Sequence, residues 1–131
     1  MQNPAAVLDT AGEWLELYNA TSRAIDLNGW TLRDDGSESH RIQNGRPLLL
    51  QAGEYVVLGR SADILADGGV APAYQYSGFT LANTADEIVL LDGAGAEIDR
   101  VAYDGGVTFP NPDGASMALL SPDLDNSLGQ N

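Results

Sequence analysis

The sequence predicts an all-β domain, a sandwich or barrel of about seven short strands. Apolar and polar residues alternate over several short segments. Turn-forming residues separate these segments at intervals of about 8–12 residues. Almost no segment has the periodicity of a helix. The length, 131 residues, fits a single domain over residues 1–131.

The first predicted strand is the alternating segment "EWLELYN", residues 13–19. Alternation places Leu15 and Leu17 on one face, which we expect to be buried. The opposite face carries Trp14, Glu16 and Tyr18. Because this second face is the less buried one, its residues are the candidates for partner binding.

The next segment, "AIDLNGWTLRD" (residues 24–34), is predicted as one strand interrupted by a bulge or tight bend at Asn28 and Gly29. Trp30 follows this bend at strand spacing, and we expect it to fill the sandwich core. "HRI" predicts a short strand. A turn at residues 51–53 precedes a strand at residues 54–60.

The second half of the chain contains the clearest hairpin. Its strands are predicted at residues 87–91 and 97–103, joined by a loop with Gly93 and Gly95 available for positive φ. A loop with one helical turn is expected at residues 61–72, and a last strand at "SMALL", residues 116–120.

The charge is strongly negative, because six Lys and Arg residues face 19 Asp and Glu residues for a net charge of −13. Such a surface disfavours direct nucleic-acid binding and anionic membranes. No apolar run approaches the ~20 residues of a membrane span. The chain has no cysteine, which excludes disulfides and thiolate metal sites.

Three stretches, in combination, resemble the lamin tail domain family: "GEWLELYNATSRAIDLNGWTLRDDG", "LLLQAGEYVVLGR" and "LANTADEIVLLDGAGAEIDRVAYDGG". The resemblance covers roughly residues 3–128, and the closing "GASMALLSPDLDNSLGQN" is similar to the bacterial extracellular type. It implies an immunoglobulin-like β-sandwich whose usual first strand, before Met1, is absent or shortened. Both ends look cut, so we expect a domain excised from a longer multidomain protein.

The resemblance implies a secreted or cell-surface bacterial protein in which this domain is a non-catalytic interaction or accessory module. Its partner would be another protein or a neighbouring domain of the parent chain. The first alternative is a domain of an extracellular endonuclease or phosphoesterase that contributes to hydrolysis. The second is a calcium-dependent adhesion or carbohydrate-binding module, for which Tyr18, Tyr74, Tyr76 and Phe79 are candidate aromatic contacts.

Catalytic chemistry has little support in the sequence. The only histidine, His40, lies beside a polar loop, where we expect it to be exposed and without a nucleophile elbow. No cofactor is expected, with calcium as the one candidate ion, because carboxylates cluster in loops. The calcium candidates are Asp34, Asp35, Asp123, Asp125 and Asn126, which lack the regular spacing of an EF-hand.

Overall fold

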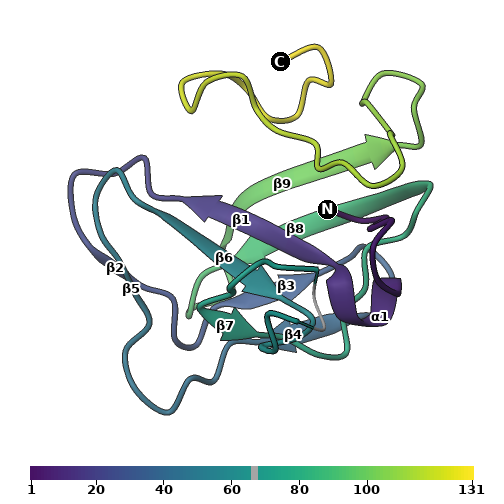
Figure 1. Ribbon diagram of the computed structural model, residues 1–131. Coiled ribbons are helices and arrows are strands. Elements are labelled where there is room, and N and C mark those ends of the chain that lie inside the picture. Colours follow the sequence, from purple (N-terminus) through teal and green to yellow (C-terminus); the bar gives the residue numbers. More distant parts are fainter. Residues whose placement is uncertain (66–67) are drawn as a thin grey trace.

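The computed structural model describes residues 1–65 and 68–131. Within that part, the chain forms nine short strands and one four-residue helix (Figure 1). The elements are α1 (Asp9–Gly12), β1 (Trp14–Tyr18), β2 (Ile25–Asp26), β3 (Thr31–Arg33), β4 (Ser39–Arg41), β5 (Leu49–Leu50), β6 (Tyr55–Gly59), β7 (Tyr74–Gln75), β8 (Ala85–Leu91) and β9 (Glu97–Asp104). No helix among the described residues has the length and apolar character needed to cross a membrane.

The strands form two main sheets, as expected for a sandwich. One sheet has the order β1-β6-β7 and the other the order β4-β3-β8-β9. The short pair β2-β5 extends this arrangement at one end (Figure 1). Strands β1 and β9 are therefore edge strands of their sheets.

The buried side chains come from both sheets and from the segment between β7 and β8. The core cluster consists of Leu15, Leu27, Leu32, Ile42, Leu50, Leu58, Tyr76, Phe79, Leu81 and Leu90. Tyr76 and Phe79 pack edge to face, with ring centroids 5.8 Å apart. Burying two aromatic rings removes apolar surface from water and so stabilises the core.

Several predicted elements are confirmed. The strand at residues 13–19 corresponds to β1, with Leu15 buried as expected. The hairpin corresponds to β8 and β9, which are antiparallel with a β-bulge at Leu90/Leu91. In its loop Gly95 has a φ of +85°, the left-handed conformation that glycine adopts without strain.

Other predictions were wrong. Residues 24–34 form two strands in different sheets, β2 and β3, because Gly29, with a φ of +94°, turns the chain between them. The "SMALL" segment is not a strand, since residues 105–131 contain none. Part of the loop expected at residues 61–72 lies outside the described residues. Trp30 is half-buried and packs against the core instead of filling it.

Residues 105–131, which we call the C-terminal arm, pass over the side of the sandwich where β1 and β9 lie (Figure 1). None of these residues is buried. Asn126 Nδ2 donates a hydrogen bond to Asp99 Oδ2 on β9 at 2.8 Å. The arm therefore covers this side without sealing it.

Candidate functional site at the open edge of strand β1

Strand β1 exposes one row of backbone groups. Two hydrogen bonds, one at each end of β1, show which of its backbone groups point towards β6. Arg60 N–H donates to the Glu13 carbonyl at 2.9 Å, and Asn19 N–H donates to the Glu54 carbonyl at 3.0 Å. In an antiparallel pair the bonded residues alternate, so Leu15 and Leu17 also bond to β6. The backbone groups of the residues between them face away from β6.

One position on this open edge is occupied. The Met1 amino nitrogen donates to the Trp14 carbonyl at 2.9 Å, and Trp14 N–H donates to the Met1 carbonyl at 3.2 Å. Within residues 1–65 and 68–131, no hydrogen bond engages the edge-facing backbone groups of Glu16 and Tyr18. Two donors and two acceptors are thus available for pairing with another strand.

The side chains of the three candidate partner-binding residues lie as the alternation predicts. Glu16 is exposed. Tyr18 is 38% exposed and packs against the 54%-exposed Tyr55 of β6, with ring centroids 4.6 Å apart and the ring planes tilted by 39°. Trp14 is half-buried and lines a hollow of about 240 Å³ beside the N-terminal segment. Glu16 and Tyr18 are therefore accessible, while Trp14 packs against its own chain.

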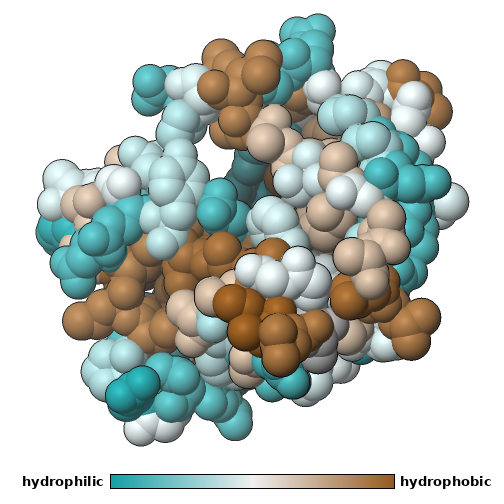
Figure 2. All heavy atoms as spheres, viewed as in Figure 1, coloured by the Kyte–Doolittle hydropathy of each residue, from teal (hydrophilic) through white to brown (hydrophobic). Residues whose placement is uncertain are grey.

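A groove of about 720 Å³ lies between β1 and β9, under the C-terminal arm. Figure 2 shows the opening between the arm and the body of the domain, with apolar atoms on both sides of it. The apolar side chains that line the groove include Leu17, Ile25, Trp30, Ile88, Ile98, Val101, Phe109, Met117, Leu119, Leu124 and Leu128. Among the described residues, three Asp or Glu side chains also line it, Glu16, Asp99 and Asp125, and no lysine or arginine does.

Gln2 shows how a chain on this edge places its side chains. Its neighbour Met1 pairs with Trp14, and the Gln2 side chain turns inward to line the groove with only 1% exposure. Gln2 Nε2 donates to Asn111 Oδ1 at 2.7 Å. Gln2 Oε1 is buried without a hydrogen-bond partner among the described residues.

A buried carboxyl group lies next to the same edge. Glu13 is 4% exposed, and its Oε2 accepts a hydrogen bond from Leu81 N–H at 3.2 Å. Burial raises the pKa of Glu13 to about 7, although this hydrogen bond and Arg60 oppose the shift. Burial likewise lowers the pKa of the Met1 amino group to about 6. Both groups change charge near neutral pH.

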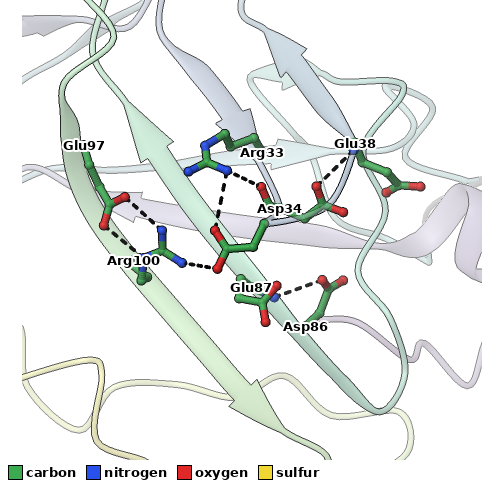
Figure 3. A network of polar contacts seen from close by, with 8 residues as sticks. Arg33, Asp34, Glu38, Asp86, Glu87, Glu97 and Arg100 are labelled. Atoms are coloured by element: carbon green, nitrogen blue, oxygen red, sulfur yellow. Dashed lines mark hydrogen bonds and ion pairs between the residues drawn. The ribbon is translucent and has the colours of Figure 1, made fainter.

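The first pair of calcium candidates lies in a network of arginine contacts on the outer side of the β4-β3-β8-β9 sheet (Figure 3). Asp35 accepts bonds from Arg100 at 2.6 Å and from Arg33 at 3.5 Å. The bond from Arg100 keeps the pKa of the Asp35 carboxyl below its usual value. Asp34 Oδ1 accepts the Glu38 N–H at 3.0 Å. A cation here would have to displace donors that are already bound.

The second group of calcium candidates lies in the C-terminal arm. Asp125 accepts the N–H and hydroxyl of Ser127, which lower its pKa. Asn126 donates to Asp99, and the Asp123 N–H donates to the Ser121 hydroxyl at 3.4 Å. Among the described residues, no three His, Cys, Asp or Glu side chains converge in the manner of a metal site.

The structure contradicts one alternative, the aromatic carbohydrate platform, and one expectation, the exposed loop histidine. Tyr76 and Phe79 belong to the core, so they cannot form an exposed carbohydrate platform with Tyr18. His40 is not in an exposed loop: it lies on β4, half-buried. Its Nε2 lies 2.8 Å from the Tyr74 hydroxyl, and its Nδ1 lies 2.8 Å from the Ser77 carbonyl. These contacts connect β4 to the segment around β7.

Sequence reasoning missed Gln2, Glu13 and the groove. Glu13 is the first residue of the predicted strand and shares a face with Leu15 and Leu17, so alternation offered a signal for its burial, although a charged residue ordinarily remains in solvent. The groove depends on where the C-terminal arm crosses the sandwich, which no local pattern predicts. The signal that did succeed was alternation, since it placed Glu16 and Tyr18 on an accessible face.

Comparison with known proteins adds one finding. The family model described as Lamin Tail Domain matches residues 1–105 of the chain. The match ends just after β9, so most of the C-terminal arm lies beyond it. No curated protein sequence matches the chain.

Proposed function

Because the chain belongs to the lamin tail domain family, whose fold is an immunoglobulin-like β-sandwich, we propose that it is a non-catalytic interaction module. It holds a partner protein or a neighbouring domain through the open edge of β1. The observation that carries this proposal is that the edge-facing backbone groups of Glu16 and Tyr18 have no partner within the described part of the chain, beside exposed Tyr18 and Tyr55.

The proposed setting is a secreted or cell-surface bacterial protein. A net charge of −13 keeps such a domain soluble and favours partners with basic surfaces. The same charge opposes contact with a phosphate backbone, which argues against a direct role in nucleic-acid hydrolysis. The hydrogen bonds of His40 further support a structural role for that residue.

Photocrosslinking tests the proposal. A photoreactive phenylalanine analogue replaces Tyr18, and the domain is exposed to surface and secreted proteins of the source bacterium. We expect a specific crosslinked protein that is lost when Glu16→Pro removes the edge-facing N–H, and kept when Glu16→Gln leaves the backbone intact.

A crosslink that survives Glu16→Pro would place the contact elsewhere on the domain. The absence of any specific crosslink from position 18 would remove the proposed function. The corresponding probe at Val107, an exposed residue outside the groove, is the control for nonspecific capture.

A further inference from the structure

We propose that the open edge of β1 and the groove beside it bind an extended polypeptide strand supplied from outside residues 1–131. The strand runs antiparallel to β1, its alternate side chains are apolar and enter the groove, and its other side chains include lysine or arginine. This inference rests on the proposed function and names the chemistry of the partner segment.

The direction follows from the pairing of Met1 with Trp14. Met1 and Trp14 exchange both backbone hydrogen bonds, which is the pattern of a hydrogen-bonded residue pair in an antiparallel ladder. The open groups of Glu16 and Tyr18 continue the same edge at the same two-residue spacing. An antiparallel strand therefore fits the next positions along β1.

The pattern of side chains follows from Gln2. Residues directly opposite each other in a ladder point to the same face, so a strand residue facing Glu16 points outward. The next residue points inward, as Gln2 does beside Met1. The inward positions meet Leu17 of β1 and Ile88 and Val101 of the facing sheet. Period-two apolar residues match this groove.

The charge of the partner strand follows from the lining of the groove. As far as the structure describes its lining, the groove has three acidic side chains and no lysine or arginine. An outward-pointing lysine or arginine opposite Glu16 forms an opposite-charge cross-strand pair, and the Tyr18 and Tyr55 rings accept a cation beside it.

A second copy of this chain fits the edge less well. Each copy carries a net charge of −13, and pairing β1 with β1 would bring two Glu16 side chains to one edge. Like charges facing each other across strands destabilise the pair. We therefore expect a basic segment from another source and not a homodimer.

Synthetic peptides of about seven residues, alternating lysine and valine, test the inference against the intact 131-residue chain. The lysines are meant to lie opposite Glu16 and Tyr18. Their side chains then point outward, and their backbone N–H groups point towards β1. One peptide is N-methylated at its central lysine and its matched control at the adjacent valine, which leaves charge and composition the same. Binding is measured by fluorescence polarisation at about 150 mM salt, where long-range electrostatic attraction is screened.

We expect the valine-methylated peptide to bind like the parent peptide and the lysine-methylated one to bind at least about tenfold more weakly. Glu16→Pro should reduce binding similarly, and Glu16→Gln less. Ile98→Lys, at a 52%-exposed position in the groove, should weaken binding. Val107→Lys adds the same charge at an 83%-exposed position outside the groove, and it should weaken binding only by the effect of that charge.

Equal binding of the two methylated peptides would overturn the inference, since attraction between opposite charges alone would explain it. A concentration-dependent dimer that Glu16→Pro abolishes and the peptide does not displace would overturn it in favour of a second copy. If no peptide binds while the Tyr18 crosslink persists, the proposed function stands and this inference fails. If the crosslink is also absent, both fail.

Discussion

Met1 and Trp14 exchange two backbone hydrogen bonds, at 2.9 and 3.2 Å, and among residues 1–65 and 68–131 none bonds to the edge-facing backbone groups of Glu16 and Tyr18, which come next along β1. The adjacent groups at Glu16 and Tyr18 lie over an apolar groove with acidic side chains. An unpaired strand edge and an open groove favour the addition of another strand. This relationship underlies both the proposed function and the proposed chemistry of the partner.

We expect the stability of the domain to decrease from pH 5 to pH 7 through Glu13. The pKa of the Glu13 carboxyl is about 7 in the folded state, against 4.5 for an unperturbed glutamate. The folded state therefore binds more protons than the unfolded state across this interval. The contribution of Glu13 to stability is fully present below pH 4.5 and is lost as the pH rises towards 7. Urea unfolding of wild type and Glu13→Gln at both pH values measures this, and the variant should lose less stability.

The Met1 amino group contributes with the opposite sign between about pH 6 and 8, because its pKa is lowered in the folded state. It is present in both proteins, so their comparison reports on Glu13. Glu16→Gln, at an exposed position, is the control and should retain the wild-type trend. Parallel pH profiles for wild type and Glu13→Gln would contradict the assignment.

Phe79→Ala should destabilise the domain by about 3–5 kcal/mol, since the ring is fully buried against Tyr76. Tyr55→Ala removes an aromatic ring that is mostly in solvent and should cost about 1 kcal/mol or less. Chemical denaturation of both variants gives the comparison. Equal losses would show that the segment between β7 and β8 does not anchor the core.

Gly59→Ala should destabilise the domain by about 1–3 kcal/mol, because the added Cβ would lie 2.5 Å from Pro72 Cγ. Gly93→Ala is the matched substitution, since its Cβ meets nothing closer than the Gly29 carbonyl oxygen at 4.0 Å. It should be neutral or stabilise by about 0.4–1 kcal/mol. Thermal melts distinguish the two, and a neutral Gly59→Ala would show that Pro72 moves aside readily.

Calcium should leave the melting temperature unchanged. Asp35 is bound by two arginines, and Asp125 by Ser127. A ligand at about 100 times its Kd adds about 2.7 kcal/mol, which is several degrees for a domain of this size. Melts in EDTA, magnesium and millimolar calcium test this expectation. A rise specific to calcium would make calcium-dependent binding the better function.

The sequence predicted most strands because alternation and turn residues act locally. β1, β6 and the β8–β9 hairpin were identified from that pattern. The division of residues 24–34 between two sheets depends on how the turn at Gly29 packs, which is a tertiary effect. The "SMALL" segment failed because a strand needs a partner, and the arm passes the sandwich without pairing to it.

The candidate site was predictable only in part. Alternation placed Glu16 and Tyr18 on an accessible face, but it could not show that Met1 would pair with Trp14 and leave the next positions open. The groove required β9 and residues about a hundred positions away to meet β1. Burial of Glu13 and Gln2 likewise arises from contacts between distant segments.

Hydrogen exchange of the β1 amides, followed residue by residue by NMR on dilute monomer, tests the open edge directly. We expect slow exchange at Leu15 and Leu17, which bond to β6, and fast exchange at Glu16 and Tyr18. Protection of Glu16 and Tyr18 equal to that of Leu15 and Leu17 would show that the edge is already covered. In that case the surface on which the interaction module depends would not exist.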